Sequence, residues 1–558
     1  MHKTNSLNLS FDTNHLMSGL KAAFSGKGSI LTELMQNARR ARATQIDVTL
    51  DETSEAGTLV VEDDGDGIVD FQQLLTIAGS NWQSRHVEET PFGVGFCAAL
   101  LNAKKVIVES NGKALRCDTE AVLAGASVDL EEGTRTRGTK VILIGMDTRA
   151  VERDLQQEGL ADGFPVPIVL NGQPMARSCA EDAQDLSFRD SPVGKIHIDP
   201  ETLRAEPRCF LQGIPVDRFN PRYRSKNVVH LDPAVFKGRF PDRRQLQNEA
   251  EALEAIAEAC HAVQVAVLEQ RAKTLANETF IKAHFNDALA LAPALLNDIE
   301  LLPGHCFHAD KEVARDRAEC YNFRPSQVAF RFSKSELFAA PVVVAEEYGE
   351  NGTVLATLTE ALGGKMMLPE VFTRLDAKHW LHEHASVIND DDSEQPVITV
   401  HNHKVHSGKL WADEGNTDLI VCDRAELSHP QIGTATLAAP VSLYTGIRRC
   451  RVEEAGKDLE QNDPCLIMHQ YDADAFRDLS PFVNEDDRVQ SEWRWEMERV
   501  VETAYLQVTN SNLAQIAKIQ LRSLLDNKLS QDLEGKRLTF GLTDGRITEV
   551  KVDGIAAA

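Results

Sequence analysis

Two polar residues near the N-terminus have the types and the spacing that a nucleotide-bound metal ion requires. Glu33 and Asn37 lie four positions apart in the run ILTELMQNA, so on a helix they lie one above the other on the same face. An amide oxygen is a hard ligand that Mg²⁺ accepts beside water and phosphate, which makes Asn37 a candidate metal ligand. A carboxylate one helical turn away can orient and deprotonate an attacking water, which makes Glu33 a candidate general base.

A second group of residues has the chemistry to bind a purine base. Asp63 follows the apolar run TLVVE and precedes the sequence DGDGI. A carboxylate buried at the end of a strand can accept a hydrogen bond from the exocyclic amine of adenine. Gly65 and Gly67 let the backbone up to Ile68 approach the base and the ribose, because glycine has no Cβ. We therefore predict that residues 63–68 contact the nucleoside.

A third segment, FGVGF at 92–96, is suited to phosphate. Gly93 and Gly95 open a segment predicted to be helical, and the first N–H groups of a helix are free to bind phosphate oxygens. Val94 and Phe96 complete this predicted contact set. A P-loop, the other common phosphate cradle, is excluded because Lys21 stands where its first glycine would be and Gly28 where its serine or threonine would be.

These residues must be positioned by a layer that mixes helices and strands. Hydrophobic spacing predicts helices at 13–43, with a break at 25–28, and at 71–78 and 93–101. Short or alternating apolar runs predict strands at 45–50, 58–62, 105–109, 114–118 and 138–144. Because this order is not a βαβ repeat, we predict an α+β fold: an α/β sandwich in which a mixed sheet carries helices on one face.

The chain is long enough for roughly three or four domains. We predict a nucleotide-binding domain at 1–155 and a second α/β domain at 156–285, with strands at 165–170, 193–198 and 209–216 and a long helix at 245–276. A mixed α/β domain of unknown role follows at 286–485. The last part, 486–558, is predicted to contain a helix at 492–529 and a hairpin at 536–552. The apolar stripe of that helix makes it a candidate dimer contact.

The composition is that of a soluble, strongly acidic protein. The 558 residues include 85 Asp and Glu against 59 Lys and Arg, a net charge of −26, which argues against a broad nucleic-acid surface. Ten cysteines are spread singly without a C-x-x-C motif, as in a reduced intracellular protein. The polar N-terminus lacks a signal-peptide core, and no apolar run could span a bilayer. We therefore expect a cytoplasmic protein without membrane contact.

Taken together, the motifs resemble the four sequence boxes of the Bergerat-fold, or GHKL, ATPases in both order and spacing. This family includes gyrase B, the ninety-kilodalton heat-shock chaperones, histidine kinases and MutL. The matching segments, in chain order, are ELMQNA at 33–38, DDGDG at 63–67, FGVGF at 92–96 and RGTKVIL at 137–143. The resemblance covers about residues 10–150, and the motif sequences are most similar to those of the heat-shock-90-like and MutL-like members.

The resemblance implies that the cofactors are ATP and Mg²⁺ and assigns a role to each box. Glu33 would be the general base, Asn37 the Mg²⁺ ligand and Asp63 the adenine contact. Thr139 would support the adenine through a water, the glycines of 93–95 would bind phosphate, and residues 79–91 would form a lid over ATP. A glutamate at position 33 argues against a histidine kinase, which also needs a dimerising phospho-acceptor helix upstream.

A basic segment at 218–244 lies where many relatives carry a transducer domain, whose basic residue reaches the γ-phosphate. Lys226, Lys237 and Arg243 are the candidates for that residue. A solvated basic loop that balances an acidic protein explains the segment equally well, so no catalytic role is assigned there.

Histidines gather at 379–384 and 401–406, with His305 and His308 elsewhere in the chain. These side chains could build a metal site, yet zinc sites usually show a tighter pattern of matched pairs. Surface or structural roles are therefore favoured for these histidines.

The resemblance implies an ATPase whose useful work is conformational. ATP would close the lid and join two N-terminal domains in a homodimer, and hydrolysis would reset this clamp. Our first hypothesis for its target is a protein client, as in chaperone-like remodelling, because of the acidic charge and the wording of 92–96 and 138–143. The second is a DNA-transaction ATPase of the MutL, type IIB topoisomerase or Morc kind, favoured by ARATQIDV at 41–48. The third is a nucleotide-gated scaffold in microbial defence.

Overall fold

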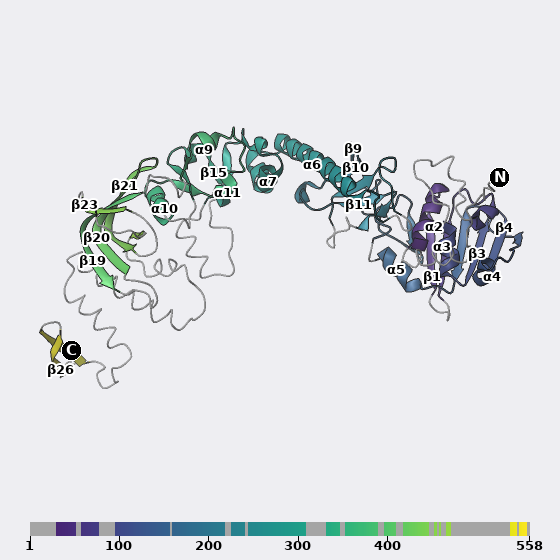
Figure 1. Ribbon diagram of the computed structural model, residues 1–558, viewed down its shortest axis with the longest axis horizontal. Helices are drawn as coiled ribbons and strands as arrows, with labels where there is room; N and C mark the ends of the chain where they lie inside the picture. The colour runs from purple at the N-terminus through teal and green to yellow at the C-terminus, as the bar shows by residue number, and fades with distance from the viewer. Residues whose placement is uncertain are drawn as a thin grey trace, which may run out of the picture. The chain divides into compact units, whose positions relative to one another are not determined.

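The structure is a computed structural model, and its contacts divide the chain into two compact units, residues 1–275 and 276–558. Each unit is described by itself below (Figure 1). The described residues are 29–51, 57–76, 95–156, 159–217, 225–239, 244–307, 331–345, 352–388, 396–408, 417–445, 451–454, 457–458, 465–469, 536–543 and 546–554.

An eight-stranded mixed sheet is the centre of the first unit. Its strand order is β5-β4-β3-β6-β2-β1-β7-β8, and every pair is antiparallel except β1 with β7. β2 and β6 are neighbours in the middle of the sheet. Their antiparallel pairing places Asp63 opposite Thr139. The strands are Ile46–Asp51 (β1), Thr58–Asp63 (β2), Lys105–Ser110 (β3), Lys113–Asp118 (β4), Leu130–Glu132 (β5), Thr139–Ile144 (β6), Ile168–Leu170 (β7) and Gln173–Pro174 (β8).

Helices cover this sheet and close its core. α2 (Ser29–Arg40) and α3 (Gly95–Asn102) pack against each other, and α3 also contacts β3 (Figure 1). The apolar stripe of α2 is buried as predicted, with Leu31 and Met35 fully covered. The other helical segments among the described residues of this part are η1 (Phe71–Leu75), α4 (Thr119–Leu123) and α5 (Thr148–Gln156). The predicted α/β sandwich with a mixed sheet is confirmed.

A second, five-stranded sheet completes the first unit. Its order is β12-β11-β13-β10-β9, with β11 and β13 parallel. The long helix predicted at 245–276 is α6 (Glu249–Thr274), and the side-chain amide of Gln264 on it donates to the carbonyl of Leu203 at 2.8 Å. The bounds of the other elements are Arg189–Ser191 (β9), Gly194–His197 (β10), Pro200–Thr202 (η4), Arg208–Leu211 (β11), Ile214–Pro215 (β12) and Val228–Leu231 (β13).

The second unit begins with α7 (Asn277–Leu291), and its described residues form three small sheets and a larger one. Their orders are β14-β15, β17-β16-β18, β25-β26 and, for the six-stranded sheet, β23-β22-β19-β20-β21-β24. The strands are Leu301–Pro303 (β14), Arg331–Ser333 (β15), Val342–Val344 (β16), Lys365–Met367 (β17), Ser386–Val387 (β18), Val397–Gly408 (β19), Thr417–His429 (β20), Gly433–Thr445 (β21), Arg451–Glu454 (β22), Lys457–Asp458 (β23), Cys465–His469 (β24), Lys536–Thr543 (β25) and Arg546–Gly554 (β26).

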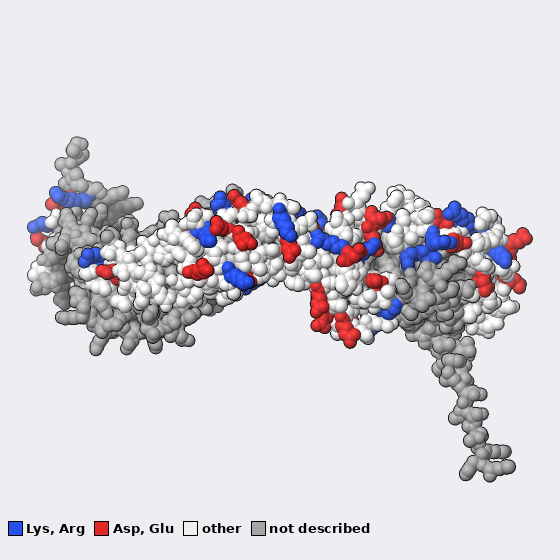
Figure 2. All heavy atoms as spheres, turned by 90° about the horizontal axis from the view of Figure 1, so that it is seen from above, with Lys and Arg blue, Asp and Glu red and all other residues white. Residues whose placement is uncertain are grey.

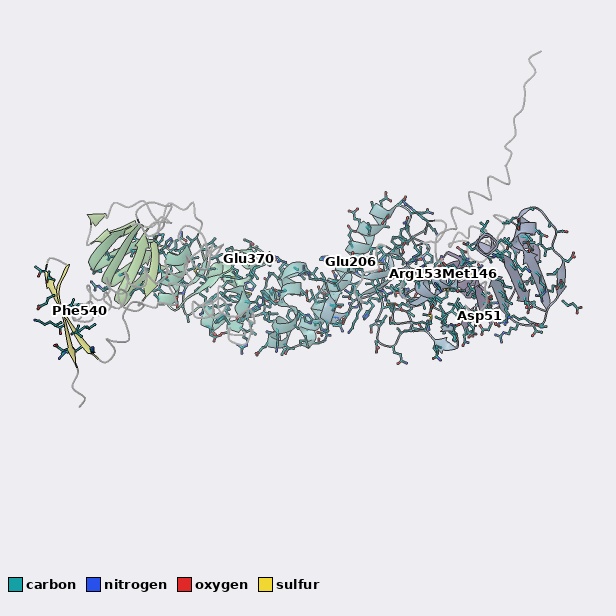
Figure 3. The ribbon with its side chains drawn as sticks, turned by 90° about the horizontal axis from the view of Figure 1, so that it is seen from below. Asp51, Met146, Arg153, Glu206, Glu370 and Phe540 are labelled. Carbon is teal, nitrogen blue, oxygen red and sulfur yellow. The ribbon has the colours of Figure 1, made fainter. Side chains whose placement is uncertain are left out.

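Short helices connect these strands. They are Pro293–Leu296 (η6), Gly304–Cys306 (η7), Lys334–Leu337 (α9), Gly352–Ala361 (α10), Pro369–Phe372 (α11) and Trp380–Glu383 (η9). The hairpin predicted at 536–552 is formed by β25 and β26, with Phe540 on β25 labelled in Figure 3. The helix predicted at 492–529 lies outside the described residues.

The charged side chains of the described residues are mixed in sign. On the face shown in Figure 2, both Lys and Arg and Asp and Glu occur among the described residues. Among the helices that the structure describes, none combines the length and the apolar character that a membrane crossing needs.

Candidate functional site

Helix α2 brings Glu33 and Asn37 to one face, as their spacing requires. Glu33 is buried, with 6% of the residue exposed, although it carries a carboxyl group. Asn37 is partly exposed. A buried carboxyl group beside a more open amide is an arrangement in which one side chain can meet a water and the other a solvated ion.

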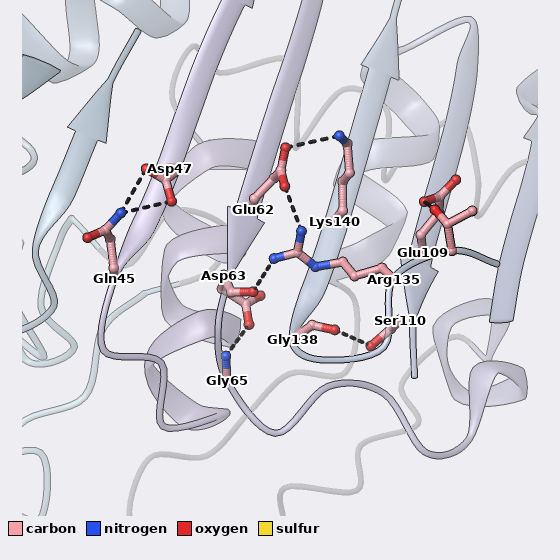
Figure 4. Close-up of polar contacts among 11 residues, drawn as sticks. Gln45, Asp47, Glu62, Asp63, Gly65, Glu109, Ser110, Arg135, Gly138 and Lys140 are labelled. Atoms are coloured by element: carbon pink, nitrogen blue, oxygen red, sulfur yellow. Dashed lines mark hydrogen bonds and ion pairs between the residues drawn. The ribbon is translucent and has the colours of Figure 1, made fainter. Parts of the chain in front are cut away.

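Asp63 ends β2 with its carboxylate turned back onto its own loop. The backbone N–H of Gly65 donates to Oδ1 of Asp63 at 2.9 Å (Figure 4), and the N–H of Thr139 also donates to this carboxylate. Burial raises the pKa of Asp63 above its ordinary value, although these two hydrogen bonds oppose the shift. The adenine contact predicted at Asp63 and the residue predicted at Thr139 are therefore direct neighbours in space.

The loop after Asp63 is tied to the end of α2 and the start of β1. The N–H of Asp66 donates to the carbonyl of Ala41 at 2.8 Å. Asp64 accepts from the backbone N–H groups of Thr44 at 2.7 Å and Gln45 at 3.1 Å. These bonds fix the distance between the helix that carries Asn37 and the strand end that carries Asp63.

Gly138 is the position where this site most strictly requires glycine. Its φ is +69°, and a Cβ there would lie 1.9 Å from the carbonyl oxygen of Asp63. The chain can pass this close to β2 only without a side chain. Gly138 thereby sets Thr139 directly opposite Asp63.

Ser110 joins three parts of the site, and no motif around it indicated this. Its hydroxyl donates to the carbonyl of Gly138 at 2.6 Å and accepts from the N–H of Ile68 at 2.9 Å. Asn111, in the turn after β3, also donates to the carbonyl of Ile68, at 3.2 Å. A fully buried serine thus connects the glycine loop with the start of β6.

A charged cluster beside Asp63 was also missed (Figure 4). Arg135 donates to the carbonyl of Asp63 and to the carboxylate of Glu62, each at 2.6 Å. Lys140 lies 3.0 Å from the other oxygen of Glu62. Burial alone would raise the pKa of Glu62, but the hydrogen bonds and charges of Lys140 and Arg135 hold it below its ordinary value. The register of β2 with β6 places Lys140 opposite Glu62, and Arg135 comes from the segment before β6.

The predicted phosphate segment is covered in part. Gly93, Val94 and the lid predicted at 79–91 lie outside the described residues. Gly95 is the first residue of α3, and Phe96 is partly exposed and packs against the core of the sheet. Since α3 packs on α2, the N-terminus of α3 belongs to the same helical layer as Glu33 and Asn37.

Two lysines of the basic segment have local partners in the loops beside the second sheet. Lys226 lies 3.8 Å from Asp199, and the ammonium group of Lys237 donates to the carbonyl of Pro233 at 2.5 Å. Arg243 lies outside the described residues. These contacts assign no phosphate-binding role to Lys226 or Lys237, so that role stays a prediction.

Two histidines of the segment 379–384 have structural contacts. Nδ1 of His379 accepts from the N–H of Leu381 at 3.2 Å, and His384 stacks on Phe338 with ring centroids 4.2 Å apart. Within the described part of the chain, no group of three or more His, Cys, Asp or Glu side chains is placed to hold a metal ion.

A comparison with known protein families finds a match for the part of the chain that carries most of the candidate site. Residues 27–132 match the family model of histidine kinase-, DNA gyrase B-, and HSP90-like ATPases. This segment contains α2, the strand end at Asp63, the glycine loop, α3 and Ser110. No curated protein matches the chain.

Proposed function

We propose that the first unit, whose residues 27–132 form a domain of the histidine kinase-, DNA gyrase B- and HSP90-like ATPases, binds Mg²⁺-ATP and hydrolyses it. The observation that carries this proposal is the fixed placement of Asp63 and Thr139 against the helix of Glu33 and Asn37. Contacts through Ala41, Thr44, Gln45 and Gly138 set that placement.

The carboxylate of Asp63 is suited to the adenine amine. It already accepts N–H groups of Gly65 and Thr139, and a carboxylate has further lone pairs for a third donor. Gly67, at φ +75°, packs against Ser110 and Asn111 with no space for a Cβ, so the loop presents backbone to the ligand. These features support recognition of the base by residues 63–68 and Thr139.

The residues of α2 fit the triphosphate and its ion. The amide oxygen of Asn37 is a hard donor in a partly exposed position, as Mg²⁺ with several retained waters requires. When bound, Mg²⁺ would neutralise charge on the phosphates. The N–H groups at the start of α3, from Gly95 and Phe96, are oriented by the helix to bind phosphate oxygens, and we propose that Gly93 and Val94 extend this contact.

Glu33 is the proposed general base. It is buried one helical turn from Asn37, so a water between its carboxylate and the metal-bound phosphate would be both oriented and deprotonated. Because a base acts on the water and not on the nucleotide, its loss should separate hydrolysis from binding.

The test replaces Glu33. Glu33→Gln should bind ATP within about threefold of the unaltered protein by calorimetry, while turnover falls by a factor on the order of 10² to 10⁴. No other residue of α2 carries a carboxylate, so the helix offers no second base that could make up the loss. Turnover that survives Glu33→Gln would remove Glu33 as the base.

We further propose that ATP joins two copies in a cytoplasmic, chaperone-like clamp that acts on a protein client. The mixed charge on the face shown in Figure 2 and the net charge of −26 support a protein partner over a nucleic acid. Light scattering of Glu33→Gln with ATP should give a dimer, and the trapped protein should retain its client on purification. Salt-dependent DNA binding would favour the DNA-transaction reading instead, and a monomer with and without ATP would overturn the clamp.

A further inference from the structure

The hydroxyl groups of Ser110 and Thr139 lie beside each other, next to the carboxylate of Asp63. Strand register places Thr139 opposite Asp63 on one side and opposite Ser110 on the other, and side chains that lie opposite each other share one face of a sheet. Oγ of Ser110 and Oγ1 of Thr139 are 3.5 Å apart, and both residues are buried. The three side chains therefore form one polar row at the end of β2, β6 and β3.

The single proton of the Ser110 hydroxyl already has a partner. It is donated to the carbonyl of Gly138, with 2.6 Å between the two oxygens (Figure 4). The N–H of Ile68 donates to the same hydroxyl at 2.9 Å. A serine hydroxyl has one proton and two acceptor lone pairs, so Ser110 keeps one lone pair and no proton for Thr139. Between these two hydroxyl groups, only Thr139 can be the donor.

This direction decides what Thr139 offers to a ligand. An ordinary O–H···O bond is about 2.7–2.8 Å long, and at 3.5 Å the attraction between the two hydroxyls is weaker. The acceptor side of Ser110 nevertheless draws the proton of Thr139 towards itself. A hydroxyl whose proton points inward presents its lone pairs outward, and the ionised carboxylate of Asp63 beside it accepts hydrogen bonds only. The wall that we propose for the base therefore consists of acceptors.

We infer that Ser110 is a positioning residue that favours adenine over hypoxanthine by keeping Thr139 an acceptor. This inference rests on the nucleotide binding proposed above. Adenine has an amine at C6, which donates to Asp63, and a bare N1, so a water between N1 and Thr139 can donate to both. Hypoxanthine has a carbonyl at C6 and an N–H at N1, which reverses both groups. A site built for one hydrogen-bond pattern rejects a ligand that leaves its polar groups unpaired.

The experiment compares ADP with inosine diphosphate, which differ only at C6 and N1, by calorimetry on the full chain with Mg²⁺. The unaltered protein should bind ADP at least about thirtyfold more tightly, because two polar groups of inosine diphosphate would be left unpaired. Ser110→Ala lets the hydroxyl of Thr139 turn and donate. The preference for ADP should then fall by at least about fivefold, whatever happens to the affinity for ADP itself.

Asn111→Gly is the matched control for support of the glycine loop. The amide of Asn111 donates to the carbonyl of Ile68 at 3.2 Å, so its loss loosens the same loop without removing a contact of Thr139. The φ of Asn111 is +49°, which glycine adopts without strain. Asn111→Gly should weaken both ligands alike and leave the ratio of their affinities within about twofold of its original value.

A double variant tests whether Ser110 acts through Thr139. Thr139→Val removes the acceptor itself and should lower the preference for ADP. Adding Ser110→Ala to Thr139→Val should change the ratio no further, because a residue that acts through the hydroxyl of Thr139 has no effect once that hydroxyl is gone. A merely structural role of Ser110 would not depend on Thr139 in this way.

Each outcome decides the inference. Weaker binding of both ligands at an unchanged ratio in Ser110→Ala would show that Ser110 only supports the loop. Equal affinities of the unaltered protein for the two ligands, or a further fall of the ratio in the double variant, would also overturn the inference. If Ser110→Ala does not fold, Ser110→Cys gives the same comparison, since a thiol is a weak donor and a weak acceptor. Failure of the unaltered protein to bind ADP at all would instead overturn the proposed function itself.

Discussion

Asp63 is the site residue that most clearly lowers the stability of the folded protein. Its carboxylate is held beside Gly65 and Thr139 by backbone bonds, and burial raises its pKa. As the pH rises, Asp63 therefore ionises in the unfolded chain, at its ordinary pKa of 3.8, before it ionises in the folded protein. The folded state loses stability between that value and the raised pKa, so an ionised Asp63 is retained at a cost in stability.

Asp63→Asn should therefore abolish nucleotide binding without lowering the melting temperature by more than a few degrees. An asparagine keeps an acceptor for the N–H of Gly65 and removes the buried charge, but it offers the adenine amine an uncharged and partly donating group. Calorimetric titration with ADP and a thermal melt make the comparison. Unchanged affinity would refute the adenine contact.

The same pKa predicts how binding depends on pH. The adenine amine needs the ionised carboxylate, so ADP affinity should fall by about tenfold per pH unit once the pH is below the raised pKa of Asp63. The fall should begin at a higher pH than an ordinary aspartate would give. A titration that stays flat down to about pH 4 would contradict the raised pKa.

At the residue scale, the site residues that belong to recognisable motifs could be predicted from the sequence. The site residues that only strand pairing brings close could not. Asp63, Gly65 and Thr139 stand in segments with a recognisable pattern. Ser110 and Arg135 lie in segments that have none. They reach the site because β6 pairs with both β2 and β3, which brings the end of β3 and the segment before β6 close to Asp63. Spacing along one strand does not determine its partners.

At the scale of elements, α2 is joined to the second sheet by one buried amide. Gln36 is fully buried, its side-chain N–H donates to the carbonyl of Gln212 at 2.9 Å, and its oxygen accepts from Arg39 at 2.9 Å. Gln212 lies in the turn between β11 and β12 with φ +55°. The next strand places Ile214 in the core of the first sheet. The helix of Glu33 is thus positioned from the second sheet as well as from its own.

Gln36→Leu should lower the free energy of unfolding by about 1–3 kcal/mol, because the half-buried carbonyl of Gln212 and the Nε–H of Arg39 each lose the bond that they make with the buried Gln36 side chain. Urea unfolding of the full chain measures the change in the first unit. Gln45→Leu is the control, since Gln45 is exposed at the start of β1, and it should change stability by less than about 0.5 kcal/mol. Equal stabilities for both variants would contradict the role given to Gln36.

In the second unit, the N-cap residue of η9 is His379, whose ring must be neutral to accept the capping hydrogen bond. His379 is 1% exposed, its Nδ1 caps η9 at Leu381, and burial lowers its pKa to about 4. The unfolded chain takes up this proton at an ordinary pKa of 6.5. Stability is therefore present above that value and is lost as the pH falls towards the folded pKa.

Acidification should thus destabilise the second unit by about 3 kcal/mol through His379 alone. His379→Asn keeps an acceptor that can cap the helix and removes the titrating ring. The variant should lose that part of the pH dependence of unfolding. An identical pH dependence in the two proteins would show that folding does not lower the pKa of His379.

The elements themselves were predicted best where a pattern is local. Strands β5 and β8 were not predicted, but the other strands of the first sheet and α6 follow from alternation and helical spacing. The parallel pairing of β1 with β7 does not, because it joins residues 46–48 to 168–170. Long-range pairs depend on packing that no short segment contains.

At the scale of the molecule, the division at residue 275 predicts an independent first unit. Residues 1–275 hold both sheets, α2, Ser110 and the turn at Gln212. A fragment that ends there should unfold cooperatively and bind ADP within about threefold of the full chain, measured by a thermal melt and calorimetry. Loss of binding would mean that the second unit supplies part of the site.

A shorter fragment tests where the nucleotide-binding domain ends. A chain that stops at residue 155, the boundary predicted from the sequence, lacks β7 and therefore exposes the edge of β1 at Ile46–Val48. It also lacks Phe164 and Ile214, both fully buried in the same core, and loss of large core side chains costs several kcal/mol each. We expect this fragment to aggregate or melt well below the one that ends at 275. If the shorter fragment kept its melting temperature and full ADP affinity, β7 and the second sheet would contribute nothing to the site.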